Sequence, residues 1–412
     1  MKTVWILNHY ATQMLYSKGG RHYAFAKYLK RAGYEPVVFG CNAKHNSDHE
    51  HFLDMTGIWQ SVTAKEIQVP FVIVQGRDYK GNGKQRILNM IDFYRNVKKS
   101  AKEYALLNGK PDVIYASSVH PLTLVAGIQL AKQFRVKCIC EVRDLWPESL
   151  VAYGIAGAYN PAVITLRKLE KWIYHKADKL IFTADGMYDY IKEQRWEKAV
   201  PQEKVYYINN GVDLELFDYN RDHYRVEDED LKKTEIFKVV YTGSVRKVNN
   251  LGILLDAAKL VKNERVRFLI WGDGDELEML RQRVQEEEIP NVIFKGSVEK
   301  QYVPYITSCA DLNIMHGEGG SIMRFGLSAN KLFDYFAAGK PLLTDFACKH
   351  NPADRFCAGP KITDYHIESL AETIDECAAM KQEQLVCMGK RARAAAEEYD
   401  YAKLTQKLMP LL

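Results

Sequence analysis

Short apolar runs alternate with segments of helical periodicity along almost the whole chain. Residues 4–7 form the first run, and residues 20–31 then place apolar side chains at intervals of three or four. Parallel strands need long crossovers, which helices of this kind supply. The alternation therefore predicts a doubly wound α/β fold. Further strand-like runs in this first series are residues 36–39, 71–74, 113–115, 138–142, 180–183 and 205–208.

A polar stretch divides the alternation into two series. Residues 218–235 are dense in charged side chains and have no apolar period. Strand-like runs resume at residues 237–241, 266–271, 292–294, 312–315 and 341–344. A chain of 412 residues is long enough for two domains. We expect an N-terminal Rossmann-like domain over residues 1–216, which a C-terminal helix over 399–412 rejoins, and a C-terminal Rossmann-like domain over 217–398.

The composition favours a globular protein in a reducing compartment. The chain is 47% hydrophobic and 26% charged. Its eight cysteines form no Cys-x-x-Cys pair, which is typical of free thiols. The first apolar run is too short for a signal peptide, and no run approaches the roughly 18 apolar residues of a membrane span. We expect a cytoplasmic protein.

One basic segment, residues 77–102, also contains apolar side chains at helical intervals. A basic helix with an apolar stripe can lie on the anionic inner face of the cell membrane. The same pattern is typical of a helix packed on the core with a solvated basic face. Both interpretations stay open, whereas nucleic acid is disfavoured because no reader motif accompanies the patch. The cations are Arg77, Lys80, Lys84, Arg86, Arg95, Lys98, Lys99 and Lys102.

Two loops of the first domain are candidates for ligand binding. Gly19 and Gly20 precede a helix, where backbone amides and the helix dipole favour an anion. The loop is not G-x-G-x-x-G, and no acidic residue ends the second strand, which disfavours a nicotinamide cofactor. His120 follows another strand and can bond a sugar hydroxyl. The alternatives are a tight turn and a structural histidine.

A third loop, again directly after a strand, offers contacts for an acceptor. Arg143, Asp144 and Glu148 can make hydrogen bonds, and Trp146 offers an apolar platform for a sugar ring. The alternative is an ion pair that caps the edge of the sheet.

The second domain opens with a strand, a Gly-Ser pair and two cations, an order that suits a pyrophosphate. Arginine binds phosphate oxygens in a bidentate manner, and lysine acts as a point charge. Glycines after the next strand let a nucleoside base approach the backbone. These candidate donor contacts are Gly243, Ser244, Arg246, Lys247, Gly272, Gly274 and Lys295.

A glycine-rich loop that contains Glu318 leads towards a helix beginning near Asn330 and Lys331. Backbone amides at the helix start, together with Lys331, would hold a diphosphate. Asp334 lies one turn further on the same face and can accept from ribose hydroxyls. The alternative is a helix that only packs on the sheet.

A histidine cluster in one polar loop raises the question of a metal. Zinc can bind such side chains, but no ligand pattern continues elsewhere in the chain, so a solvated loop is the favoured interpretation and no metal site is expected. The cluster consists of His45, Asp48, His49 and His51.

Several of these motifs occur in the order typical of one enzyme family, and together they cover nearly the whole chain. They are Gly19-Gly20, Asn210-Gly211-Val212-Asp213, Gly272-Asp273-Gly274 and Ala337-Ala338-Gly339-Lys340-Pro341. The chain resembles the retaining glycosyltransferase family 4, whose GT-B fold has two Rossmann-like domains facing across a cleft. The run from Arg143 to Ser149, with Lys331 entering the later helix, is similar to a branch of bacterial N-acetylfucosaminyltransferases.

The chain departs from the family pattern at two places. The family usually carries two glutamates eight positions apart before Ala-Ala-Gly, and these fall on Gly326 and Asp334. The resemblance thus implies a ribose contact at Asp334, with the donor-sugar contact either absent or supplied by Glu318. The usual Lys-Gly of the diphosphate loop is replaced by Asn249-Asn250.

The resemblance implies transfer of an N-acetylated hexosamine or deoxyhexosamine from a UDP-sugar, with retention at the anomeric carbon. The acceptor would be a glycan or a polyprenyl-diphosphate-linked sugar in O-antigen or capsule synthesis. His120, Arg246 and Lys331 are the implied catalytic residues, and neither a metal nor another cofactor is required. A nucleotide-sugar epimerase of the same fold and a non-catalytic nucleotide-sugar-binding protein are the alternatives.

Overall fold

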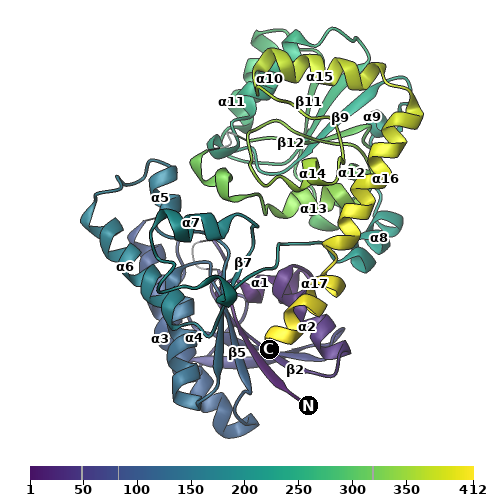
Figure 1. Ribbon diagram of the computed structural model, residues 1–412. Helices are drawn as coiled ribbons and strands as arrows, with labels where there is room; N and C mark the ends of the chain where they lie inside the picture. The colour runs from purple at the N-terminus through teal and green to yellow at the C-terminus, as the bar shows by residue number, and fades with distance from the viewer. Residues whose placement is uncertain (48–49, 82, 318–319) are drawn as a thin grey trace. The chain divides into compact units, whose positions relative to one another are not determined.

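The computed structural model describes residues 1–47, 50–81, 83–317 and 320–412. The chain divides into two compact units, each built on its own sheet (Figure 1). Unit 1 comprises Met1–Asn209 with Tyr401–Leu412, and unit 2 comprises Asn210–Asp400. The predicted α/β class with parallel sheets is confirmed. No described helix is long and apolar enough to cross a bilayer.

The sheet of unit 1 is parallel except at one edge. In spatial order its strands are β3 (Trp59–Ala64), β4 (Val69–Val74), β2 (Glu35–Cys41), β1 (Thr3–Leu7), β5 (Val113–Ser117), β6 (Lys137–Val142), β7 (Lys179–Phe182) and β8 (Val205–Tyr207). The chain winds outward from β1 in one direction and from β5 in the other. This reversal of strand order creates a switch point between the carboxyl ends of β1 and β5, where ligands of such sheets bind.

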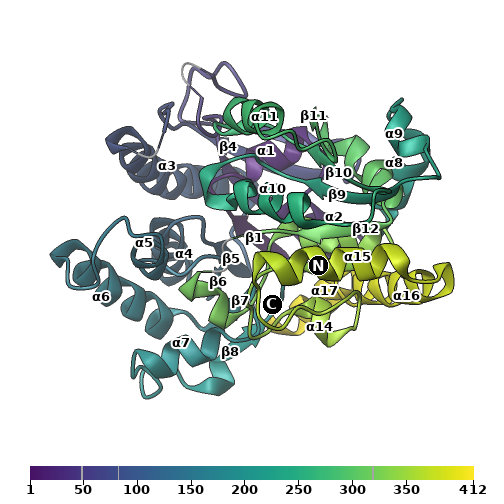
Figure 2. The same ribbon diagram turned by 90° about the horizontal axis from the view of Figure 1, so that it is seen from above.

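Helices cover the sheet of unit 1, as Figures 1 and 2 show. They are α1 (Ala11–Tyr16), α2 (Arg21–Arg31), α3 (Lys84–Asn108), α4 (Pro121–Phe134), α5 (Glu148–Ala152), α6 (Pro161–Lys176), α7 (Met187–Glu193) and α17 (Tyr401–Leu408). The last helix rejoins the unit through its chain end. Lys2 donates to the Leu412 carbonyl at 2.7 Å, and the rings of Phe25 and Tyr401 meet edge-on at 5.6 Å.

The edge strand β3 is absent from the sequence prediction. It runs antiparallel to β4, and its residues Gln60, Ser61 and Thr63 are polar. An edge strand in contact with solvent has no continuous apolar run, which was the pattern used to recognise strands.

Apolar side chains of the helix that contains most of the basic segment pack in the core of unit 1. Met90, Phe93, Val97 and Tyr104 on α3 are all buried. This favours the core-packed interpretation of residues 77–102, although Ile87 within the segment remains exposed. A membrane contact through this segment stays a prediction.

The sheet of unit 2 has the strand order β11 (Val292–Gly296), β10 (Val266–Trp271), β9 (Phe237–Thr242), β12 (Leu312–Met315) and β13 (Leu342–Thr344). All pairings are parallel. The reversal of strand order falls between β9 and β12, so their carboxyl ends form the switch point of this unit. Its helices are α8 (Leu214–His223), α9 (Glu229–Lys232), α10 (Leu251–Leu260), α11 (Leu277–Glu286), α12 (Val303–Ser308), α13 (Asn330–Ala337), α14 (Pro352–Arg355), α15 (Ile367–Ala379) and α16 (Gln382–Glu398).

The polar stretch 218–235 contains helix rather than a plain linker. Asp213 and Asp228 cap α8 and α9 through side chains that accept from backbone amides. Because α8 packs against α12 and α13, it belongs to unit 2. The division of the chain therefore falls between Asn209 and Asn210, ahead of the expected residue 216.

Gly272 lies where the carboxyl ends of three strands of unit 2 meet. Its amide donates to Gly296 at 2.8 Å, and Gly243 donates to Trp271 at 2.9 Å. A Cβ at Gly272 would come within 1.7 Å of the Gly243 carbonyl oxygen, and its φ of +152° disfavours any other residue.

We expect Gly272→Ala to lower the free energy of unfolding by about 3 kcal/mol or more, because the β9 and β10 ends must separate. Chemical denaturation measures this change. Gly157→Ala is the matched control, since nothing lies within 4 Å of its added Cβ, and its effect should stay within about 0.5 kcal/mol. Equal stability of the two variants would contradict the close approach at Gly272.

Candidate functional site

A pocket of about 410 Å³ lies at the carboxyl edge of the sheet in unit 2. The ends of β9 and β10, the loop after β11 and the first turn of α13 form its walls. It brings together six of the predicted donor contacts, namely Gly243, Ser244, Gly272, Asn330, Lys331 and Asp334.

The pocket is shaped by the way α13 docks on β9. The buried hydroxyl of Tyr335 accepts from the Thr242 amide at 2.9 Å, which holds the helix against the strand end. Among the described residues, no side chain caps the amides of the first turn of α13, and helix starts of this kind favour an anion. The helix starts at Asn330, as the sequence predicts.

Lys331 is a partly buried cation of this pocket, whose lining also includes Lys300. Its ammonium donates to the Tyr241 hydroxyl at 3.1 Å and lies 4.5 Å from the centre of that ring. Burial lowers the pKa of Lys331 to about 8, although the charge of Asp345 opposes the shift. No ion pair between described residues involves Lys331. A partly buried cation without a carboxylate partner is suited to an anionic ligand.

Asp334 faces the same pocket one helical turn beyond Lys331. Burial raises the pKa of its carboxyl group, and Lys300 opposes that shift. A carboxylate here is an acceptor that could bond the hydroxyls of a ribose. Asn249, at the first of the two positions that depart from the family pattern, donates to the Ser244 carbonyl at 2.7 Å and so holds the loop after β9.

Other predicted donor contacts do not line the pocket. Arg246 and Lys247 are exposed on the loop after β9. Gly274 lies against the chain itself, because a Cβ there would come within 2.0 Å of the Val245 carbonyl oxygen. Lys295 forms ion pairs with Asp228 at 2.7 Å and with Asp230 at 2.6 Å. Glu318 lies outside the described residues.

A buried histidine–aspartate pair at the neighbouring strand ends was missed by the sequence prediction. His316 follows β12 and Asp345 follows β13, and the Nδ1 atom of the histidine bonds the carboxylate. Its Nε2 atom lies 3.0 Å from the Asn250 carbonyl oxygen. Despite burial, the charge of Asp345 raises the pKa of His316. The signal was present, since each residue directly follows an apolar run.

In unit 1, Gly20 ends the glycine loop and is the N-cap residue of α2. The next residue, Arg21, is buried and donates from Nε to Glu141 at 2.8 Å and from Nη2 to the Ile208 carbonyl at 2.7 Å. A further bond at 2.5 Å reaches the Asn209 carbonyl. The arginine therefore joins the start of α2 to β6 and to the segment where unit 1 ends.

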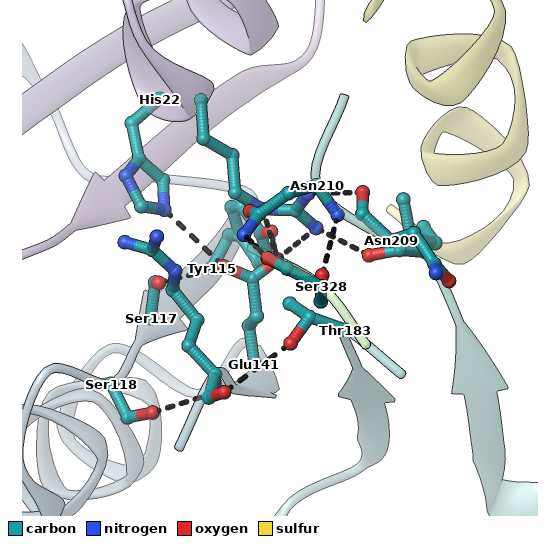
Figure 3. Close-up of polar contacts among 12 residues, drawn as sticks. His22, Tyr115, Ser117, Ser118, Glu141, Thr183, Asn209, Asn210 and Ser328 are labelled. Carbon is teal, nitrogen blue, oxygen red and sulfur yellow. Dashed lines mark hydrogen bonds and ion pairs between the residues drawn. The ribbon is translucent and has the colours of Figure 1, made fainter. Parts of the chain in front are cut away.

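Glu141 is the centre of this polar network. It accepts from the Tyr115 hydroxyl and, at 2.7 Å, from the Ser117 hydroxyl (Figure 3). Burial is the largest single influence and would raise the pKa of Glu141, but the charges and hydrogen bonds of Arg21 and His22 together hold that pKa well below the ordinary value. The carboxylate is therefore ionised and enclosed by donors.

His120 lies at the switch point of unit 1 and is only 1% exposed. Its Nε2 atom is 2.7 Å from Nδ1 of His9, which follows β1. Burial lowers the pKa of both rings, that of His9 to about 3. The two neutral rings thus share one hydrogen bond, and His9 is a neighbour that the sequence did not single out.

The predicted acceptor contacts lie close together after β6. The Arg143 amide donates to Ser118 at 3.0 Å, and its carbonyl accepts from Thr183 at 3.3 Å (Figure 3). Glu148 pairs with Arg167 of α6 at 3.0 Å, which realises the ion-pair alternative for that residue. Two others, Asp144 and Trp146, line one small, mainly apolar cavity.

No cluster of side chains suited to a metal ion occurs among the described residues. In the predicted histidine cluster, Asp48 and His49 lie outside the described residues. His45 bonds the Tyr79 hydroxyl, and His51 lies 3.3 Å from the Gly76 carbonyl oxygen.

Two family models match the chain in succession. Residues 22–216 match Glycosyltransferase Family 4, and residues 236–379 match Glycosyl transferases group 1. These two segments are thus similar to glycosyltransferase domains. These domains correspond in order to the two predicted ones.

Curated relatives match part of the chain. WbjE of Pseudomonas aeruginosa, which is named as a glycosyltransferase, is 26% identical over 234 residues, or 56% of each chain. TuaH of Bacillus subtilis, named for teichuronic acid biosynthesis, is 26% identical over 210 residues, or 50% of this chain and 49% of its own. The chain thus spans about half the length of these curated relatives.

Solved structures match the chain over its whole length. The Anabaena protein HepE in complex with UDP aligns with a TM-score of 0.64 at 16% identity, covering 100% of this chain and 99% of its own. OtsA aligns with a TM-score of 0.69 at 11% identity, covering 99% and 98%. Both are GT-B glycosyltransferases, so the predicted GT-B fold is confirmed. These matches do not confirm the narrower prediction that the chain belongs to the N-acetylfucosaminyltransferase branch.

We expect Glu141→Gln to lower the free energy of unfolding by about 3–5 kcal/mol at neutral pH, because the charge of Arg21 is then buried without its partner. Since the pKa of Glu141 is depressed in the folded state, its contribution is present at neutral pH and is lost as the pH falls below the unfolded value. Denaturation as a function of pH should therefore show a shallower acid loss in the variant.

Glu148→Gln is the control for that measurement. Its side chain also forms an ion pair with an arginine, but the side chain of Arg167 is 24% exposed. The free energy of unfolding should therefore fall by about 1 kcal/mol or less. If both variants lost equal stability, the burial of the Arg21–Glu141 pair would have no special energetic role.

Proposed function

We propose that the chain is a retaining glycosyltransferase that transfers a sugar from a UDP-sugar to an acceptor hydroxyl. The observation that carries this proposal is Lys331, a partly buried cation at the start of α13 with no carboxylate partner in the described part of the chain. The two glycosyltransferase domains and the UDP bound in the HepE structure support the same donor class.

In this proposal the donor diphosphate lies on the free amides of α13 beside Lys331. Asp334 would accept from the ribose, and Gly272 would let the base approach the backbone. Negative charge grows on the diphosphate as its bond to the sugar breaks, and a fixed cation and helix amides stabilise it. The exposed Arg246 and Lys247 can add to this charge, so the proposed reaction needs no metal ion.

The leaving diphosphate helps to take the proton of the acceptor hydroxyl, on the face where the bond to the sugar breaks. The configuration at the anomeric carbon is then retained. His120 is the proposed catalytic residue of unit 1. Arg143, Asp144 and Trp146 of the same unit would contact the acceptor. Because Nε2 of His120 faces His9, a sugar contact through this atom requires the ring to exchange that hydrogen bond.

The proposed donor sugar is an N-acetylated hexosamine or deoxyhexosamine. The proposed acceptor is a glycan or a polyprenyl-diphosphate-linked sugar in surface polysaccharide synthesis. The motif order of the chain and the name of TuaH support this class.

We expect UDP, among UDP, GDP, ADP, TDP and CMP, to raise the melting temperature most. A ligand at 100 times its dissociation constant adds about 2.7 kcal/mol. Lys331→Met should remove the shift. Lys295→Met is the matched control, because Lys295 pairs with aspartates outside the pocket, and the shift should persist. No shift with any nucleotide would contradict the proposed donor site.

Measurements of turnover distinguish a glycosyltransferase from the two alternatives, an epimerase and a nucleotide-sugar-binding protein. Product should form from a UDP-sugar and acceptor in the presence of EDTA, and NMR should show the anomeric configuration of the donor. Isomerised donor without acceptor would indicate an epimerase. Nucleotide binding without any turnover across the acceptor class would indicate a binding protein, and loss of activity with EDTA would contradict metal independence.

The affinity for UDP should fall as the pH rises above about 8, because Lys331 then loses its charge. The stability of the unliganded protein should change in the opposite direction. Between pH 8 and 10.5 the unfolded chain holds a proton that the folded chain has released, so stability rises with pH. Titration calorimetry and denaturation measure the two trends.

Lys331→Arg provides the control, since arginine stays charged throughout this range. Its UDP affinity should not show the decline above pH 8. A decline that persists unchanged in this variant would assign the pH dependence to another group.

A further inference from the structure

Large apolar side chains are exposed along one continuous stretch of unit 1, from the end of α5 through α6. Tyr159 is 92% exposed, and Ile155 is 70% exposed. Tyr153, Ile164 and Trp172 are also exposed. In both views α6 lies at the outer edge of unit 1 (Figures 1 and 2).

The geometry of α6 separates a core face from this outer face. Val163, Ile173 and Tyr174 are buried, and α6 packs against α4. Ile164, Lys168 and Trp172 follow one another at intervals of four residues, so they form a single stripe. Part of the apolar surface of Ile164 and Trp172 therefore faces solvent, at 41% and 38% exposure.

The exposed charged side chains of this stretch are positive. Lys168, Lys171 and Lys176 are exposed. Within residues 149–176 the one carboxylate is Glu170, which is buried and accepts from Tyr174 at 2.7 Å and Tyr190 at 2.6 Å. Burial raises the pKa of Glu170 to about 8, which further reduces negative charge there.

We propose that this surface docks on an anionic lipid bilayer. The docking face consists of Tyr153, Ile155, Tyr159, Ile164, Lys168, Lys171 and Trp172. Tyrosine and tryptophan favour the headgroup level of a bilayer, aliphatic side chains enter the acyl boundary, and lysines attract anionic headgroups. A protein partner fits less well, because the core of a protein interface is depleted in lysine, whereas Lys168 lies between Ile164 and Trp172.

The docking face is tied to the predicted acceptor loop. Arg167 of α6 pairs with Glu148 at 3.0 Å and donates to the Ala158 carbonyl at 3.3 Å. These bonds join α6, the α5–α6 connection and the loop after β6. If the proposed function holds, docking brings this loop to a lipid-linked acceptor, and this part of the inference rests on that function.

The basic helix α3 is the competing location. Met90, Phe93 and Val97 of its apolar stripe are buried in unit 1. Ile87 is exposed within the basic segment, and Leu106 and Leu107 are exposed at the end of the helix, beyond that segment. The helix therefore supplies matched control variants of the same chemistry on another surface.

The test is sedimentation of the full chain with vesicles of phosphatidylcholine alone or of equimolar phosphatidylcholine and phosphatidylglycerol. We expect binding to the anionic vesicles only. Lys168→Glu/Lys171→Glu and Tyr159→Ser/Trp172→Ser should each weaken it by about tenfold or more. The controls Lys99→Glu/Lys102→Glu and Leu106→Ser/Leu107→Ser should bind as the wild type does.

Two results would overturn the proposal: no binding to anionic vesicles, or an equal loss in the α3 controls. Light scattering identifies the protein alternative, since a dimer that Tyr159→Ser/Trp172→Ser abolishes, without vesicle binding, would make this face a protein interface. Thermal denaturation checks that every variant is folded. Vesicle binding needs no nucleotide, so its failure and the failure of UDP binding are separate outcomes.

Discussion

The Arg21–Glu141 ion pair holds the carboxyl edge of unit 1 together. A guanidinium and a carboxylate are both removed from water there, and such burial is tolerated only when hydrogen bonds satisfy the two groups. The hydroxyls of Tyr115 and Ser117 donate to the carboxylate, and the carbonyls after β8 accept from the guanidinium. One interaction thereby positions the glycine loop, two central strands and the end of the unit, and the site residues after β5 and β6 depend on it.

Unit 2 shows the opposite arrangement at the corresponding edge of its sheet. Lys331 is also removed from much of the solvent, yet the carboxylate nearest to it in the series of strand ends, Asp345, is bonded to His316. Lys331 therefore has no ion-pair partner among the described residues. The buried charge of unit 1 is paired within the chain, whereas in the proposed function the charge of Lys331 is paired by the ligand.

Local sequence patterns predict the elements that are buried along their whole length, but they do not predict those that are partly exposed. The parallel strands are mostly apolar and buried, so their apolar runs predict them, whereas the polar edge strand β3 has no such run. The charged composition of residues 218–235 predicts a linker, because capping by Asp213 and Asp228 is a short signal beside that composition. Lys295 lies at the end of β11 and Lys331 in the first turn of α13, yet only contacts across the unit distinguish a lysine paired with aspartates from one without an ion-pair partner.

The sequence by itself determined the α/β class, the two series of strands and the residues that follow the strand ends. These properties depend on periodicity and on turn chemistry, which act over a few neighbouring residues. Only the tertiary structure decided which of those residues meet. It paired Glu141 with Arg21, placed His9 beside His120, and exposed Ile164 and Trp172 on α6 while burying Phe93 and Val97 on α3. The reason is that ion pairing and burial depend on distances between segments far apart in the chain, and local patterns do not contain those distances.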